Sequence, residues 1–186
     1  MTLVSTFELL VKPIVDAPGE PFARTVVQGY FLTVANTSTL DIALRVLFTA
    51  TTPEITFNDA VVVSDVFGIN TPPVPPQVLG GNPNKTFTDF KLPANDTGLV
   101  TLLPSPDAFK GQKLEIRGYV EIFLLFADSY ERIRPANVNL LLTPEHRGTF
   151  LPKDIQAVQA DFDQLAYALP TSIGGSLFTL TVPPQV

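Results

Sequence analysis

The sequence contains one short group of residues that could perform acid–base chemistry, Glu145-His146-Arg147. Histidine titrates near neutral pH and can act as a general base, whereas an arginine guanidinium can hold an anion. In such a site Glu145 would orient His146, and Arg147 would bind the anionic group of a ligand or substrate. These three residues are therefore the candidate binding residues of the chain.

A structural interpretation of the same segment is simpler, and we favour it. The group lies in a polar stretch, 143–148, directly after an apolar run, which is typical of a turn. Neighbouring side chains of an extended chain point in opposite directions, so Glu145 and His146 would not share a face. A Gly-x-Ser-x-Gly nucleophile motif is absent from the sequence. On this interpretation His146 is an exposed turn residue and the protein is not an enzyme.

Acidic residues form two further candidate groups. Asp161 and Asp163 would share one face of a strand, and with Asp154 they could offer oxygen ligands to Ca²⁺. The order of residues that builds an EF-hand loop is absent, and two acids on one strand face are typical of a solvated surface.

Glu115 and Glu121 could act as the paired carboxylates of a glycosidase. Because the sequence has no tryptophan and only 4 tyrosines, a stacking platform for sugars is missing. We expect neither a metal nor another cofactor.

The composition excludes several classes of function. With no cysteine and 1 histidine, the 186-residue chain cannot form thiolate sites or zinc sites of the finger type. A net charge of −6 repels a phosphate backbone, so we expect no nucleic-acid partner. Neither a signal peptide nor an apolar run long enough for a membrane helix is visible. We therefore expect no membrane span and, by default, a cytoplasmic location.

Low charge is the most informative feature of the composition. Charged residues make up 16% of the chain, whereas soluble domains average about 25%. The mean hydropathy is accordingly positive, at +0.25. Either threonine and asparagine cover the surface, or part of the surface is hidden against a partner. Both interpretations stay open at this point.

Apolar and polar residues alternate along nearly the whole chain, as expected of half-buried strands. The runs Val26–Ala35 and Ile42–Phe48, joined by a short turn, predict a hairpin. A second hairpin is predicted near the end, from 165–169 through 170–175 to 178–182. The run Tyr119–Phe126 is apolar on both faces, so it is either a covered central strand or part of an interface. Further strand candidates are 7–11, 60–66, 85–91, 98–103 and 133–142.

One segment could be helical. Apolar residues across 153–168 recur at helical spacing, but they also alternate. We favour a strand from Phe162 onward, preceded by at most one short helix near 153–161. The 18 prolines lie between the apolar runs, where they cannot interrupt a strand ladder.

These patterns predict an all-β protein, an antiparallel β-sandwich that resembles immunoglobulin-like domains in general architecture only. We expect a single domain over residues 1–186 with a long Pro/Gly-rich loop at 67–84. That loop could instead link two domains. Within one domain it could carry function, for example as a polyproline II ligand, or it could simply cover an edge strand.

The leading functional hypothesis is a non-enzymatic β-sandwich module that acts by protein–protein contact, as a homo-oligomer or on another protein. It rests on the low charge, the doubly apolar run Tyr119–Phe126 and the scarcity of catalytic motifs. The alternative is a small-molecule or carbohydrate-binding domain, or a hydrolase, with its site in loops. That alternative requires at least some of Glu121, Glu145, His146 and Asp163 to converge in one cleft.

Overall fold

The computed structural model describes residues 1–13, 24–51, 59–109, 113–127, 137–151 and 162–181. The strands are, in chain order, β1 (Thr2–Pro13), β2 (Thr25–Asn36), β3 (Ile42–Ala50), β4 (Ala60–Val66), β5 (Ile69–Asn70), β6 (Gln77–Leu79), β7 (Asn82–Leu92), β8 (Thr97–Pro104), β9 (Leu114–Ala127), β10 (Asn137–Leu151), β11 (Asp163–Ala168) and β12 (Leu177–Thr181). One short 3₁₀ helix, η2 (Pro106–Phe109), follows β8. The described residues contain no helix that is both long and apolar enough to cross a membrane.

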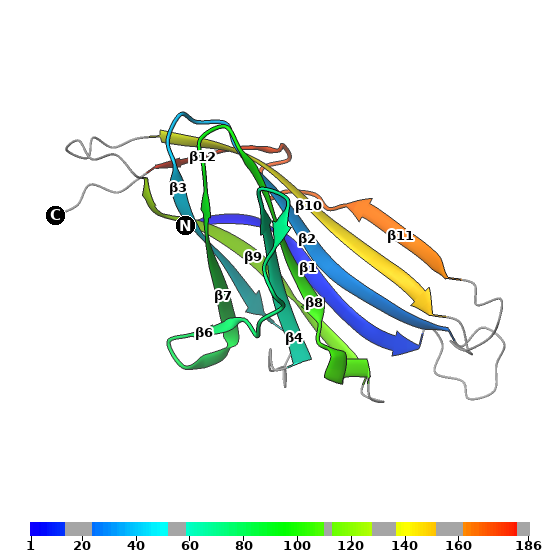
Figure 1. Cartoon of the computed structure of the whole chain (residues 1–186). Coiled ribbons are helices and arrows are strands. Elements are labelled where there is room, and N and C mark those ends of the chain that lie inside the picture. Colours follow the sequence, from blue (N-terminus) through cyan, green and yellow to red (C-terminus); the bar gives the residue numbers. More distant parts are fainter. Residues whose placement is uncertain (14–23, 52–58, 110–112, 128–136, 152–161, 182–186) are drawn as a thin grey trace.

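These strands form one continuous antiparallel sheet that curls on itself like half of a barrel (Figure 1). The main path runs β5-β4-β8-β2-β1-β9-β3-β7-β6, and β10 adds to β2 with β11 and β12 on its far side. The all-β, antiparallel class is thereby confirmed. The immunoglobulin-like sandwich is not confirmed, because the described strands belong to one curled sheet and not to two separate ones. The short helix expected near 153–161 lies outside the described residues.

The sheet divides at β2. Along one edge, β2 pairs with β10 from Thr25 to Asn36. Along the other edge, its first part (25–28) pairs with β1 and its second part (30–35) pairs with β8. Gly29 stands at the point where one neighbour replaces the other. We call this division the fork. Its two arms are β1 and β8, and the hydrophobic core lies between them.

One long strand, β10, carries both outer strands, β11 and β12. β12 pairs with residues 137–141 of β10, and β11 pairs with residues 145–150. The predicted hairpin between these two segments is therefore wrong, since both add separately to β10. Pro144 lies at the junction between β12 and β11, where no N–H is required for a ladder bond. Its carbonyl accepts a hydrogen bond of 2.9 Å from the N–H of Leu169.

The hairpin predicted for β2 and β3 is also wrong, because β3 pairs with β7 and β9. Asn36, the last residue of β2, redirects the chain. Its side-chain amide donates to the carbonyl oxygens of Leu40 and Pro93, both at 2.8 Å. Its side-chain oxygen accepts a bond of 2.7 Å from the hydroxyl of Ser38. Turn residues follow β2 as predicted, but they lead the chain to a different part of the sheet.

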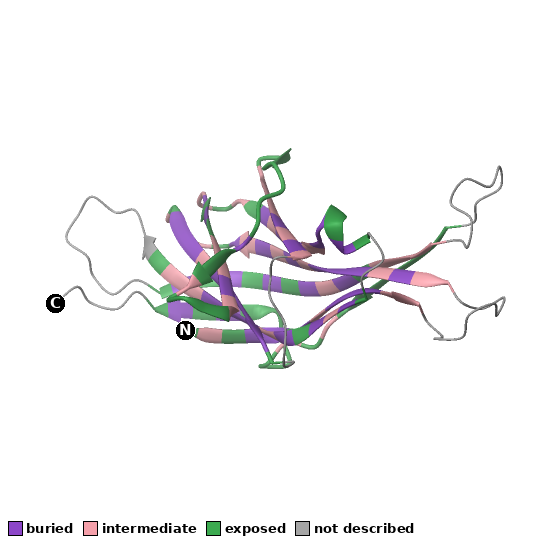
Figure 2. Cartoon of the chain, turned by 90° about the horizontal axis from the view of Figure 1, so that it is seen from below, coloured by how far each residue is buried: buried purple, intermediate pink, exposed green. Residues whose placement is uncertain are grey.

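The core explains the alternation of the sequence. Buried and exposed residues follow one another along the strands (Figure 2). The rings of Phe7, Tyr30 and Phe48 meet edge to face, with centroid distances of 5.8–6.2 Å. Such pairs each contribute about 0.5–1.5 kcal/mol beyond the burial of their area. This aromatic cluster joins β1, β2 and β3 across the inside of the curled sheet.

The segment expected as a long loop, 67–84, contains β5, β6 and the start of β7. Val74 forms an isolated bridge with Val62, so the segment lies along the outer edge of β4 and covers part of it. The two turns within it are two-residue hairpin turns with positive φ at both positions, Phe67-Gly68 (64° and 71°) and Gly80-Gly81 (59° and 74°). This geometry matches the right-handed twist of the strands but favours glycine and asparagine.

Candidate functional site

His146 occupies the middle of β10, and the expectation of an exposed turn histidine is wrong. Only 5% of the residue is exposed, and it pairs in register with Tyr30 on one side and Tyr167 on the other. The supposed loop at 143–148 is a continuous part of the strand. The imidazole packs edge to face against both tyrosine rings, with centroids 6.3 and 5.4 Å away.

Both nitrogens of this imidazole have partners within the fold. Nε2 accepts a hydrogen bond of 2.9 Å from the backbone N–H of Glu8. A nitrogen that accepts carries no proton, so the proton of the neutral ring is on Nδ1. Nδ1 lies 2.9 Å from the hydroxyl oxygen of Tyr167 and donates to it. Neither nitrogen is left for a substrate, so this arrangement suits a structural role better than general-base catalysis.

The fork explains why β1 needs this histidine. The β1–β2 ladder ends at Leu10↔Gln28, and a continued ladder would have paired Glu8 with Tyr30. Tyr30 pairs with β8 instead. The backbone N–H and carbonyl of Glu8, which have no partner on β2, form hydrogen bonds with side chains instead. His146 accepts from the N–H, and the amide of Gln28 donates to the carbonyl oxygen at 3.4 Å.

A closed ring of hydrogen bonds results. The Tyr167 hydroxyl donates to Oε1 of Gln28 at 3.4 Å, and Nε2 of Gln28 donates to the Glu8 carboxylate at 3.2 Å. Arg117 also binds the Glu8 carboxylate, at 2.5 Å. Burial lowers the pKa of His146 below its ordinary value of 6.5, and the negative charge of Glu8 partly opposes that shift. The pKa of Tyr167 is raised by burial and by Glu8. Both groups are therefore neutral at pH 7.

Glu145 and Arg147 lie on the opposite face of β10, as alternation along a strand requires. Oε2 of Glu145 is 2.9 Å from both Nε and Nη2 of Arg147. The Arg147 guanidinium lies over the ring of Phe31, 4.6 Å from its centroid. The sequence group 145–147 therefore does not form one site: the histidine belongs to the hydrogen-bond ring, and its two neighbours belong to the other side of the sheet.

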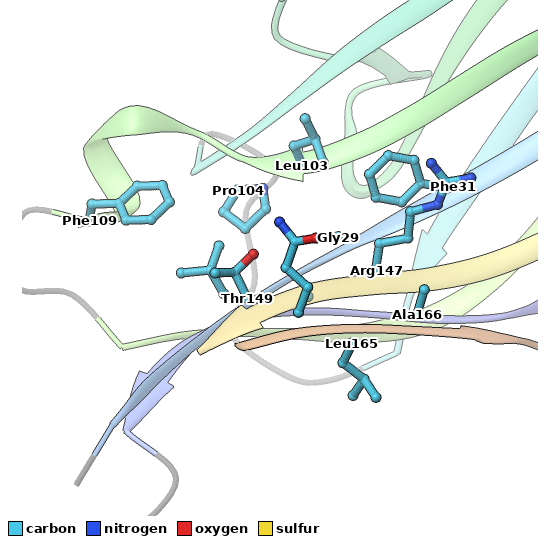
Figure 3. A pocket seen from close by; sticks show the side chains of 12 residues that line it. Gly29, Phe31, Leu103, Pro104, Phe109, Arg147, Thr149, Leu165 and Ala166 are labelled. Carbon is cyan, nitrogen blue, oxygen red and sulfur yellow. The ribbon is translucent and has the colours of Figure 1, made fainter. Parts of the chain in front are cut away.

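A groove opens on that other side, and Arg147 forms part of its wall (Figure 3). Its volume is about 480 Å³, and the lining comes from β2, β8, η2, β10 and β11. Gly29, at the fork, forms the floor. The remaining residues that line it are Val27, Phe31, Leu103, Pro104, Phe109, Gly148, Thr149, Gln164, Leu165 and Ala166. Sequence reasoning anticipated Arg147 as an anion-binding residue but did not find this groove.

The other candidate acids lie apart. Glu115 is bound by Lys12 at 2.5 Å, and the hydrogen bond from this lysine lowers its pKa. Glu121 is buried on the outer face of β9, and Asp163 pairs with Arg24 at the start of β11. Asp154 and Asp161 lie outside the described residues. Across the parts of the chain that the structure describes, no three His, Asp or Glu side chains gather in a group that could hold a metal ion.

One signal for the buried histidine was present in the sequence. Val138, Leu140 and Leu142 alternate toward the core, and the same alternation continues to positions 144 and 146. Pro144 concealed it, because proline inside an apolar run normally ends a strand. The fork has a weaker signal, which is Gly29 in the middle of a strand run, a position typical of close backbone approach. The sequence matches no protein-family model and no curated protein.

Proposed function

We propose that the protein is a non-enzymatic β module that acts by protein–protein contact and associates with a second copy of itself through the outer face of β9. The observation that carries the proposal is the composition of that face. Gly118, Val120 and Ile122 point to the core, so the alternate residues point outward. Those outward residues include Tyr119 and Phe123, which are half-buried, and Leu125, which is 41% exposed.

The apolar surface extends to the neighbouring strand β1. Leu3 pairs in register with Glu121 and is 46% exposed. We call Leu3, Tyr119, Glu121, Phe123 and Leu125 the β9 face. Burying a leucine side chain completely contributes about 1.5–3 kcal/mol. A strand with apolar residues on both faces gains this energy only when both faces are covered.

Charge on and beside the β9 face favours a second copy as the occupant. Glu121 is 8% exposed; its backbone pairs in register with Leu3 and Leu47, but its carboxylate has no ion pair or hydrogen bond with a described residue. Arg45 of β3, which pairs in register with Phe123, lies 3.8 Å over the ring of Phe87 and binds Asp89 at 2.7 Å. A two-fold axis sets one patch against itself. It would bring each Glu121 toward Arg45 of the other copy.

Light scattering on two matched variants tests the proposal. Leu125→Asp places a charge in the β9 face, whereas Leu177→Asp places the same charge on β12, where the leucine is 56% exposed. We expect the wild type and Leu177→Asp to have a multiple of the chain mass of 20.2 kDa at tens of micromolar, and Leu125→Asp to have the mass of one chain. A wild type that stays at one chain mass, or a Leu125→Asp variant that associates like the wild type, contradicts the proposal.

A further inference from the structure

Gly29 forms the floor of the groove at the fork. An added Cβ at Gly29 would lie 2.5 Å from Cδ2 of Leu103 and 3.1 Å from the carbonyl oxygen of Leu102. The paired strand β8 therefore lies close against the β2 backbone here, and a side chain at position 29 would have to displace the end of Leu103. Because β8 and β1 separate at this residue, a hollow remains between the end of β8 with η2 and the surface of β10 with β11.

One wall of the groove is apolar. Leu103 and Pro104 come from β8, and Phe109 comes from η2 (Figure 3). Val27 adds to this surface from β2. The volume of about 480 Å³ lies within the range of about 300–1,000 Å³ that is common for small-molecule sites. An apolar molecular body fits such a wall.

The opposite wall carries the polar groups. Among the described residues that line the groove, Arg147 has the one charged side chain. Glu145 engages its Nε and Nη2, which fixes the guanidinium over Phe31, while no described residue binds Nη1. The hydroxyl of Thr149 and the amide of Gln164 have no hydrogen-bond partner within the described ranges. A planar guanidinium with free donors matches a carboxylate, and neighbouring hydroxyl and amide groups can add hydrogen bonds to it.

We infer that this groove binds a small carboxylate with an apolar body, and that Arg147 holds the carboxylate. Thr149 and Gln164 donate hydrogen bonds to its oxygens, and the body packs against Leu103, Pro104 and Phe109. The site lies at the fork, away from the β9 face, so its occupancy does not depend on self-association of the protein.

Titration of the ¹⁵N-labelled chain tests this site, with 2-naphthoate and octanoate as probes and with 2-naphthylmethanol as the uncharged analogue. The amide signals of Gly29 and Gly148 report on the groove directly. We expect saturable shifts of both signals with at least one carboxylate and binding at least tenfold weaker for the uncharged analogue. A response to 2-naphthoate alone shows that the groove takes a carboxylate with a flat aromatic body. A response to octanoate alone shows that it takes one with an aliphatic body.

Three variants locate the binding. Arg147→Gln removes the cation and should weaken binding of the carboxylate at least tenfold. Ala166→Phe fills the groove and should abolish the shifts, whereas Ala168→Phe, on the same exposed face of β11 but outside the lining, should keep them. The inference is overturned if no carboxylate gives a saturable shift. It is also overturned if Arg147→Gln or Ala166→Phe, confirmed as folded from their amide spectra, binds like the wild type.

Discussion

The backbone N–H of Glu8 donates a hydrogen bond of 2.9 Å to Nε2 of His146, a residue 138 positions away in the chain. This bond replaces the ladder bond that β1 loses when β2 turns to pair with β8. A buried donor without a partner costs about 1–3 kcal/mol. The single histidine of the sequence is therefore a structural part of the fork, although its residue type alone suggests catalysis.

Replacing this histidine should destabilise the fold. His146→Phe keeps a ring of similar size against Tyr30 but leaves the Glu8 N–H without an acceptor. We expect a loss of about 1–3 kcal/mol in the free energy of unfolding, measured by urea denaturation. Glu145→Gln, on the exposed side of the same strand, should change it by less than about 1 kcal/mol, because surface ion pairs contribute little. Equal midpoints for His146→Phe and the wild type would show that the bond is dispensable.

The stability of the protein should depend on pH through the same residue. Burial keeps the pKa of folded His146 below the ordinary 6.5 of the unfolded chain. Between these two values the unfolded state binds more protons, so the free energy of unfolding rises with pH in that interval. The stabilisation that neutral His146 provides is complete above pH 6.5. It is lost as the pH falls from there through the pKa of the folded state.

Urea denaturation at a series of pH values checks this dependence, with His146→Phe as the reference chain. The difference in free energy of unfolding between wild type and variant should shrink as the pH falls below 6.5. Protonation puts a hydrogen on Nε2, which then opposes the Glu8 N–H instead of accepting from it. A difference that stays constant from neutral to mildly acidic pH would contradict this description of the ring.

Phe67 occupies a turn position that suits another residue. It has a φ of 64° and is 70% exposed, whereas the equivalent turn between β6 and β7 has Gly80 at the same position. Phe67→Asn should therefore raise the free energy of unfolding by about 0.5–1 kcal/mol. Gly80→Phe makes the reverse change and should lower it by a similar amount. If the first variant is less stable than the wild type, the phenylalanine makes contacts that outweigh its backbone strain.

Gly118 should tolerate no side chain at all. A Cβ at this position of β9 would lie 1.9 Å from the backbone carbonyl oxygen of Thr49 in the paired strand β3. This clash is relieved only if the two strands separate. We therefore expect Gly118→Ala to lower the free energy of unfolding by about 3 kcal/mol or more. Gly175→Ala, which meets nothing within 4 Å, is the matched control and should unfold like the wild type. Thermal unfolding followed by circular dichroism distinguishes the two variants.

Alternation in the sequence predicts the strands well, since it reports which side chains face the core. Alternation places Ile42, Leu44, Val46 and Phe48 on one face, and all four are buried in β3. Alternation contains no information about which strand lies alongside. The predicted partners of β3, β11 and β12 are therefore wrong, because strands that follow one another in the sequence are not neighbours in this sheet.

The fork and the groove could not be read from the sequence for a related reason. Both depend on a strand that changes partner part-way along its length, and the only local trace of that change is Gly29. The ring around His146 joins residues from β1, β2, β10 and β11, which no sequence spacing relates. Arg147 was a reasonable candidate for anion binding by residue type, but its apolar surroundings come from β8 and η2.

Self-association through the β9 face is tested most directly at Leu125. The chain has no cysteine, so Leu125→Cys and Leu177→Cys each carry a single thiol. The rate at which this thiol reacts with a disulfide reagent can be measured at low and at high protein concentration. We expect the thiol at position 125 to react several-fold more slowly at high concentration, while the thiol at position 177 reacts equally fast at both. A rate at position 125 that is independent of protein concentration would contradict burial of this face by a second copy.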